Sequence, residues 1–380
     1  MAVTCGLSVA SNYFAQPLLK TIGHDLRMST AVAGLVVTAA QLGFALGVVL
    51  LVPLGDLVER RRLAVTLCAA TSVFLAVTAS ATNAAMLLAG TALTGLSSVA
   101  AQVIVPYAAT LAPSHRRGRT IGTVMTGMLL GILLARTAAG LLSDLGGWRT
   151  VYWINAALMA LMAVLLPHAL PRLRTPSGLS YPALLRSTAM LLDCEPVLRW
   201  RAALGALSFA VFSMLWTALA FLLSGPGYHW SESAIGLVGL AGAAGSLAAT
   251  VTGRLADRGL VHYVTGVSAV LLLGSWWLLA LGGAGGTWPC VALLAGIIVL
   301  DAAVQALHIS NQNLVYAIRP EARNRINSAY MTSYFIGGAG GSALTATVWP
   351  ATGWNGVCAL GAALSALVVL LGLRRRTAVV

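Results

Sequence analysis

Five polar residues follow one face of a long apolar stretch in the second half of the chain. They are Asp301, Gln305, His308, Gln312 and Tyr316, separated by steps of four, three, four and four residues. On a helix these steps keep all five side chains within about 80° of arc. Such a face does not lie against lipid, because polar groups in a membrane face either water or another helix.

An arginine lies deep in another apolar stretch. Arg136 is about 16 residues, or ~24 Å of helix, from the charged start of its stretch. A guanidinium at this depth costs a few kcal/mol or more, so it needs a cavity or a partner. The acidic candidate is Asp301, and a carboxyl group balanced between burial and a nearby arginine can release and take up a proton. An imidazole such as His308 titrates near neutral pH. We predict a proton and substrate site here; a structural Arg–Asp pair that joins two helices is the alternative.

The composition indicates a chain that lies mostly within a membrane. Hydrophobic residues make up 58% of the 380 residues and charged residues 9%, whereas a soluble domain carries roughly 25% charged residues. Apolar runs of about 20 residues recur from end to end, and each predicts a transmembrane helix. We predict an all-α membrane protein with twelve such helices, at residues 2–19, 30–53, 63–81, 84–111, 120–143, 150–170, 199–223, 233–252, 262–282, 287–315, 326–349 and 353–373.

The net charge of +13 comes from basic residues that are distributed unevenly between the predicted loops. In every second loop the basic residues are only Lys20, Arg27 and Arg149. The other loops hold clusters of arginine, at Arg60–Arg62, Arg116, Arg117, Arg119, Arg172, Arg174, Arg199, Arg201, Arg254, Arg258, Arg319, Arg323, Arg325 and Arg374–Arg376. This asymmetry predicts that both termini lie in the cytoplasm. Because topology explains the charge, we exclude nucleic acid as a partner and expect the lipid bilayer instead.

The two halves of the chain repeat each other. A charged loop at residues 52–62 (VPLGDLVERRR) has a counterpart at residues 253–259 (GRLADRG), and Asp56 and Asp257 are 201 positions apart. An even number of helices in each half predicts a parallel repeat about an axis along the membrane normal. The predicted domains are a six-helix bundle at 1–170, a cytoplasmic linker at 171–198 and a second six-helix bundle at 199–380. Within the linker, residues 183–192 could form an amphipathic surface helix.

These loops resemble the signature of the major facilitator superfamily of secondary transporters, approximately G-x-L-A-D-R-x-G-R-R, and the resemblance covers the whole chain. Residues 253–259 match its first half, and residues 52–62 keep Asp56, Arg60 and Arg61. The stretches NYFAQPLL (12–19), GILLAR (131–136) and RPEARNRINSAYMTSYFIGG (319–338) are similar to a bacterial branch of efflux-type members. The chain departs from the family at Thr91, where many members have arginine, and at Ala135-Arg136, where exporters usually have Gly-Pro.

The resemblance implies that the two charged loops gate the cytoplasmic side. Asp56 follows the C-terminal end of a helix, where the helix dipole disfavours a carboxylate, so it needs a cation or the N-terminus of another helix. Its own loop and the helix start near Arg325 offer candidates. A solvated aspartate in an ordinary loop is the alternative. The predicted gating residues are Asp56, Arg60, Arg61, Gly253, Asp257 and Arg258.

The resemblance also places the first, fourth, seventh and tenth helices around a central cavity. Taken singly, each polar residue in these helices is more often a helix-packing residue than a ligand. The seventh helix contributes Phe209, Phe212 and Trp216, which suit an aromatic or amphipathic solute. Besides the residues already named, the predicted substrate and proton site includes Asn12, Tyr13, Gln16, Gln102, Trp216 and Tyr330.

Glycines mark two helices for close packing. Gly127 and Gly131 form a G-x-x-x-G motif, and Gly337, Gly338, Gly340 and Gly341 crowd a later helix. Small residues let two backbones approach. We predict that the two halves slide against each other on these faces; a static helix contact is the alternative.

These patterns predict a monomeric transporter in a bacterial cytoplasmic membrane. We expect alternating access, with proton-coupled efflux of small amphipathic molecules such as drug-like compounds or sugars. The alternatives are a uniporter or uptake symporter of a small metabolite, and a non-transporting sensor on the same scaffold. We expect no enzyme, no cofactor and no metal, because the sequence has no nucleophile–base pair and no metal-ligand cluster, and its five cysteines are scattered.

Overall fold

The computed structural model describes residues 1–113, 117–172, 180–242, 245, 248, 251–255, 258–318 and 323–374, and these are helices joined by short turns. The first half of the chain forms six membrane crossings, two of which are each divided into two helices. Its elements are α1 (Ala2–Ala10), α2 (Ala15–Asp25), α3 (Thr30–Leu50), η1 (Val52–Asp56), α4 (Arg60–Ala79), α5 (Ala84–Ser97), α6 (Ala100–Leu111), α7 (Arg117–Gly146) and α8 (Trp148–Ala169).

The second half begins after a surface helix, α9 (Tyr181–Cys194), which coincides with the predicted amphipathic helix. It buries Leu184, Thr188 and Leu191. The long helix α15 passes through Gly353, whose backbone is not helical, and so contains two crossings. The elements after α9 are α10 (Pro196–Leu223), α11 (Glu232–Val238), η3 (Gly239–Gly242), α13 (Val261–Leu281), η4 (Gly282–Ala284), α14 (Thr287–Tyr316) and α15 (Arg323–Arg374).

Among the described residues, nine helices are long and apolar enough to cross a membrane. One of them is α15 with its two crossings, and the divided pair α1–α2 and the shorter apolar helix at Glu232–Gly242 supply the remaining two. This agrees with the predicted all-α fold of twelve transmembrane helices. The domain boundaries at residues 170 and 199 stay a prediction.

Two of the divided crossings meet at their breaks. The first crossing is interrupted at residues 11–14 and the fourth at residues 98–99. Ser8 Oγ donates to the carbonyl oxygen of Ser98 at 2.5 Å, and Asn12 Nδ2 donates to Ser98 Oγ at 2.8 Å. Backbone groups freed inside a membrane must find such partners, because no water is present there to bond them. The two breaks therefore stabilise each other.

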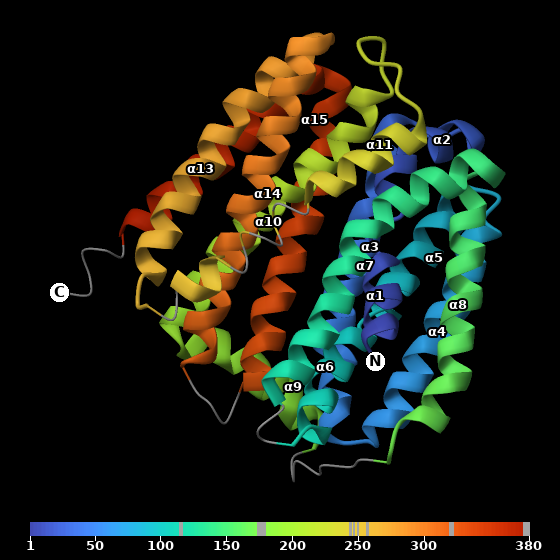
Figure 1. Cartoon of the computed structure of the whole chain (residues 1–380), viewed down its shortest axis with the longest axis vertical. Coiled ribbons are helices and arrows are strands. Elements are labelled where there is room, and N and C mark those ends of the chain that lie inside the picture. The colour runs from blue at the N-terminus through green and yellow to red at the C-terminus, as the bar shows by residue number, and fades with distance from the viewer. Residues whose placement is uncertain are drawn as a thin grey trace.

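Figure 1 shows α1 and α3–α8 on one side and α10, α13, α14 and α15 on the other, with α9 at one end of the molecule. We call the end with α9, Arg172 and the starts of α4 and α10, which carry Arg60 and Arg199, the arginine-rich end. The opposite end carries Asp25 and Arg149. The two halves meet where α3 packs on α15, where α7 packs on α11 and where α2 packs on α10.

The predicted glycine faces pack within each half rather than between the halves. A Cβ atom at Gly131 would lie 2.3 Å from the carbonyl oxygen of Gly6 on α1, and one at Gly127 would lie 2.4 Å from that of Ala2. Likewise, Gly337 and Gly341 lie against the α10 backbone, at Ala206 and Ala210. For these four glycines the sliding-face prediction is wrong, and the static helix contact holds. Gly338 differs, because a Cβ there would meet Gln41 on α3 of the other half.

We expect Gly131→Leu to prevent folding, because the new side chain would collide with α1 backbone that no rotamer change can move. Overpacking against side chains alone costs roughly 1–3 kcal/mol. The matched control is Gly122→Leu on the same helix, where nothing lies within 4 Å of the Cβ position. The measurement is the yield of monodisperse protein after detergent extraction. Equal yields of the two variants would contradict the packing of α7 on α1.

Candidate functional site

A cavity of about 770 Å³ lies between the two halves. Its lining comes from α1, α3, α6 and α7 of the first half and from α10, η3, α14 and α15 of the second. All five residues of the polar face on α14 line it: Asp301, Gln305, His308, Gln312 and Tyr316. The lining continues to Ala317, Asn324 and Asn327 at the arginine-rich end. The polar face therefore borders a cavity rather than a neighbouring helix alone.

Arg136 lies at the inner part of this cavity, on α7, and only 2% of its surface is exposed. Its Nε donates to Gln16 Oε1 on α2 at 2.6 Å. Its guanidinium carbon lies 3.9 Å from the ring centroid of Trp216, 4.9 Å from that of Tyr13 and 5.5 Å from that of Phe212. The positive charge is thus held by aromatic faces, which attract cations electrostatically.

Asp301 lies near Arg136 without pairing with it. Trp216 Nε1 donates to Asp301 Oδ1 at 3.2 Å. The four ion pairs found in the described part of the chain do not include Arg136 with Asp301. The indole of Trp216 contacts both groups, one through its ring face and the other through its N–H. A direct Arg–Asp pair between two helices, the alternative considered above, is therefore not what the structure contains.

His308 lines the cavity in front of a buried tyrosine. The imidazole Nδ1 and the hydroxyl oxygen of Tyr330 are 3.1 Å apart, so one of them donates to the other. Tyr330 is fully buried, and a Cβ atom at Gly205 would lie 2.9 Å from its hydroxyl oxygen. Tyr330 therefore positions His308 from behind. Tyr334 lines the cavity, and its ring centroid lies 4.6 Å from that of His308, with the ring planes tilted by 48°.

The remaining site candidates separate into three groups. Tyr13 and Gln102 line the cavity directly. Gln16 and Trp216 lie behind the lining, and each contacts a lining side chain, Arg136 or Asp301. Asn12 bonds instead to Ser98 at the helix breaks, and the cavity lining does not include it.

Several lining residues escaped the sequence reasoning. One face of α7 contributes an apolar wall with spacings of three and four residues, namely Met125, Met128, Leu129, Ile132 and Leu133, which leads to Arg136. Helical periodicity traced back from Arg136 would have identified these residues. By contrast, Phe44 and Phe335, from opposite halves, contact each other at the cavity wall, with ring centroids 4.2 Å apart and ring planes tilted by 36°. No sequence pattern links these two positions.

The halves are bonded to each other toward the opposite end. Thr137 Oγ1 donates to the carbonyl oxygen of Gly236 at 3.0 Å, and Lys20 Nζ donates to that of Ser224 at 2.6 Å. Ser233 on α11 donates to the carboxylate of Asp144 on α7. The glycines allow this approach, since a Cβ at Gly140 would lie 2.2 Å from the carbonyl oxygen of Glu232. The cavity is therefore closed on this side.

A charged cluster within the first half lies at the same end. Trp148 Nε1 donates to Asp25 Oδ2 at 3.0 Å, and Arg149 pairs with the same oxygen at 2.5 Å. The hydrogen bond from Trp148, followed by that from Arg149, lowers the pKa of the Asp25 carboxyl below its usual value. The cluster ties the end of α2 to the start of α8, both in the first half.

The profile described as Major Facilitator Superfamily matches residues 1–299 of the chain. The chain belongs to the Major Facilitator Superfamily. The uncharacterized transporter YgaY of Escherichia coli O157:H7 is 52% identical over 371 residues, covering 98% of this chain and 93% of that protein. The chloramphenicol resistance protein of Streptomyces lividans is 27% identical over 300 residues, covering 78% and 72%. Among solved structures, the nucleoside transporter NupG matches with a TM-score of 0.76 at 16% identity, over 98% of this chain and 99% of its own.

The superfamily's signature loop in the first half is held by bonds within that half. Asp56 pairs with Arg60 at 3.2 Å. Arg60 also donates to the carbonyl oxygen of Gly55 and to Thr110 on α6. Arg61 pairs with Glu59 and donates to the carbonyl oxygens of Pro167 and Leu170. Of the two candidate sources of a cation for Asp56, its own loop supplies the partner here.

The signature loop of the second half is described only in part. Asp257 lies outside the described residues. Gly253 has nothing within 4 Å of its Cβ position, and the backbone N–H of Arg258 donates to the carbonyl oxygen of Leu255. The Arg258 side chain is exposed.

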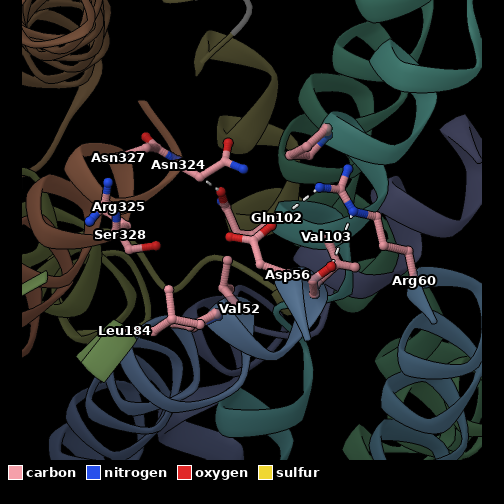
Figure 2. Close-up of a pocket in the computed structure, with 13 residues that line it drawn as sticks. Val52, Asp56, Arg60, Gln102, Val103, Leu184, Asn324, Arg325, Asn327 and Ser328 are labelled. Atoms are coloured by element: carbon pink, nitrogen blue, oxygen red, sulfur yellow. Dashed lines mark hydrogen bonds and ion pairs between the residues drawn. The ribbon is translucent and has the colours of Figure 1, made fainter. Parts of the chain in front are cut away.

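A smaller pocket at the arginine-rich end brings the first signature loop opposite the start of α15. Figure 2 shows Asp56 and Arg60 on one side of it and Asn324, Arg325 and Ser328 on the other. Arg325 donates to Ser187 on α9 at 3.2 Å. A 3.5 Å contact from Asn327 to Gln102 joins the two halves across this pocket (Figure 2). At this pocket the two halves thus face each other, with a long hydrogen bond between them.

Proposed function

We propose that this superfamily member is a monomeric, proton-coupled secondary transporter that exports small amphipathic molecules by alternating access. The observation that carries the proposal is the central cavity, which is closed toward the opposite end and holds Asp301 beside Arg136 in its inner part. A carboxyl group in such a place can exchange a proton with whichever side of the membrane the cavity faces. His308 and the amides of Gln305, Gln312 and Gln102 offer hydrogen bonds to a solute along the same cavity.

The arginine distribution supports an orientation for this state. Arginine-rich loops lie on the cytoplasmic side by the positive-inside rule, so the cavity of this structure would face the cytoplasm of a bacterial cell, with both termini on that side. Loading from the cytoplasm is the step expected of an exporter in this state. Two six-helix bundles, residues 1–170 and 199–380 with a linker at 171–198, would rock about the cavity.

The two signature loops would control the cytoplasmic end. Asp56 and Arg325 line the same pocket from different halves. We expect that Asp56 exchanges its contact with Arg60 for the start of α15 when this end closes, because a helix start and a nearby arginine both stabilise a carboxylate. Arg61, Gly253, Asp257 and Arg258 complete the proposed gating set.

Apolar and aromatic side chains support an amphipathic solute. Phe209 stacks on Tyr334 at 4.1 Å and on Phe212 at 5.4 Å, and all three line the cavity. Pockets of this composition bind organic solutes whose bulk is apolar and whose few polar groups are oriented by specific bonds. The similarity to a chloramphenicol resistance protein supports drug-like compounds and the export direction.

One observation favours a second candidate, uptake by proton symport. Asp301 and Arg136 lie close enough to interact electrostatically. A solute that occupies Arg136 removes that interaction and favours a protonated Asp301, so solute and proton would bind together.

The test uses proteoliposomes that contain the full chain and a trapped pH indicator, with chloramphenicol or a disaccharide added outside. Export by antiport, operating in reverse, makes the lumen more alkaline as the solute enters, whereas symport makes it more acidic. A solute that enters without any change in lumenal pH would contradict proton coupling. Protein-free liposomes measure the background.

A further inference from the structure

Two hydrogen-bond donors beside the cavity are buried without an acceptor. Arg136 Nη2 and Gln16 Nε2, both in described residues, have no hydrogen-bond partner. They belong to side chains that are already bonded to each other through Arg136 Nε and Gln16 Oε1. Arg136 is 2% exposed and Gln16 1% exposed. Leaving such donors unbonded destabilises the fold, most of all for a charged group, so this position favours an acceptor.

The surroundings of Arg136 retain its charge rather than neutralise it. Rings of Trp216, Tyr13 and Phe212 lie over the guanidinium. Aromatic faces attract a cation, but they accept no conventional hydrogen bond and carry no net charge. A buried guanidinium that is not directly paired with a carboxylate remains costly, and an anion that brings two acceptor oxygens relieves that cost.

The protein's own carboxylate does not fill this role. Asp301 Oδ1 accepts from Trp216 Nε1, and the four ion pairs of the described residues do not include Asp301 with Arg136. Among the described residues of the cavity lining, Arg136 and Asp301 are the two whose side chains are ionised at neutral pH by their ordinary chemistry. Among the described lining residues, Asp301 is thus the one carboxylate, and it is bonded to Trp216; an acceptor carried by a solute would fill the vacant position at Arg136.

Glycines leave space beside both charged groups. Gly239 and Gly242 line the cavity on η3. A Cβ atom at Gly239 would lie 2.9 Å from Cβ of Arg136, and one at Gly242 would lie 3.2 Å from Oδ2 of Asp301. Any side chain at these positions would occupy the approach to the two groups. The apolar wall of Phe212, Met128 and Ile132 adjoins this approach.

We propose that the substrate is an amphipathic anion: a carboxylate joined to an aromatic or alicyclic body. The inference rests on the proposed transport function and names the class of solute that the same cavity takes. The carboxylate accepts from Arg136 Nη2, and Gln16, which accepts from Arg136 Nε behind the lining, holds the guanidinium in position. The ring lies against Phe212 and the α7 wall, where it replaces water.

The experiment compares three probes of one shape on the purified full-length protein: naphthoate, naphthamide and naphthylmethylammonium. Isothermal titration calorimetry measures their affinities at pH 7. Charge-assisted, bidentate hydrogen bonds are about twice as strong as neutral ones, so we expect naphthoate to bind at least about tenfold more tightly than naphthamide, with the ammonium weakest. Equal affinity for the acid and the amide, or preference for the ammonium, would overturn the proposal without any variant.

Variants then show which residues produce the preference for naphthoate over naphthamide. Arg136→Gln is expected to make the affinities for naphthoate and naphthamide equal, and Gln16→Leu to reduce the difference. The control is Arg149→Gln, which removes one positive charge outside the cavity. This variant should retain the preference for naphthoate over naphthamide. A preference for naphthoate that survives in a folded Arg136→Gln protein would assign the anion to another site. If Arg136→Gln does not fold, Gln16→Leu and the wild-type probe series decide.

The outcomes separate this proposal from the proposed function. Selective naphthoate binding in a protein that moves no proton with any solute would leave the anion site standing and contradict proton-coupled transport. Proton-coupled movement of chloramphenicol or a disaccharide, with no preference for naphthoate over naphthamide, would leave the transport function standing and contradict the anion site.

Discussion

Asp301→Asn is expected to reduce pH-driven transport to the level of protein-free liposomes. Asparagine is nearly isosteric with aspartate, and its side-chain oxygen can still accept the hydrogen bond from Trp216 Nε1. What the variant loses is the capacity to bind and release a proton. We therefore expect the folded structure and the cavity to remain, while the coupling disappears.

The measurement is flux into proteoliposomes under an imposed pH gradient, compared with counterflow exchange of the same solute at equal pH. Counterflow needs alternating access but no net proton movement, so it should persist in Asp301→Asn. Asp193→Asn on the exposed end of α9 removes a carboxylate outside the cavity and serves as the control. If pH-driven flux survives in Asp301→Asn, Asp301 is not the coupling group. Loss of both flux and counterflow together would assign it a structural or binding role instead.

Helical periodicity was enough to predict the polar face of α14. All five of its residues came to line the cavity because a helix imposes one geometry on steps of three and four residues. The depth of Arg136 was equally predictable, since depth follows from position along a helix of known rise. What the sequence did not contain was Trp216 as the link between the guanidinium and the carboxylate. That contact depends on how α7, α10 and α14 rotate against each other.

Glycine patterns predicted close approach but not the partner helix. Gly127 and Gly131 pack on α1 of their own half. The contact between halves uses other small residues, Gly140 and Gly236, whose spacing forms no motif. A small side chain permits many neighbours, and the topology of the bundle selects among them.

The interruptions of the first and fourth crossings also escaped prediction. Residues 11–14 contain neither glycine nor proline, and residues 98–99 are Ser and Val. Residues 98–99 therefore gave no local signal for a break, whereas Pro17, which has no N–H to donate to the carbonyl of Tyr13, gave one for the first crossing. The breaks are stabilised by bonds from Ser8 and Asn12 to Ser98, between helices about 90 residues apart in sequence. Tertiary bonds of this kind override local preference, and a single sequence does not reveal them.

A cross-link between the two halves at the opposite end is expected to stop transport completely. Asp144 on α7 and Ser233 on α11 touch each other and belong to different halves. In alternating access this contact must open once in each cycle, so a covalent bridge holds the protein in the state of this structure. The double variant Asp144→Cys with Ser233→Cys, bridged by a short bifunctional thiol reagent that a reductant cleaves, tests this directly. Cys194→Ser and Cys290→Ser remove the thiols that are not buried.

The matched control is the pair Asp25→Cys with Arg149→Cys. These residues lie at the same end and are in contact, but both belong to the first half. A bridge there should leave counterflow unchanged, because α2 and α8 would move as one body. Restoration of flux by reductant in the first pair excludes damage by the reagent. If counterflow continued in the bridged Asp144–Ser233 variant, the closed end of this structure would not be a gate. Solute would then still cross the membrane, so the contact between Asp144 and Ser233 would not have to open during transport.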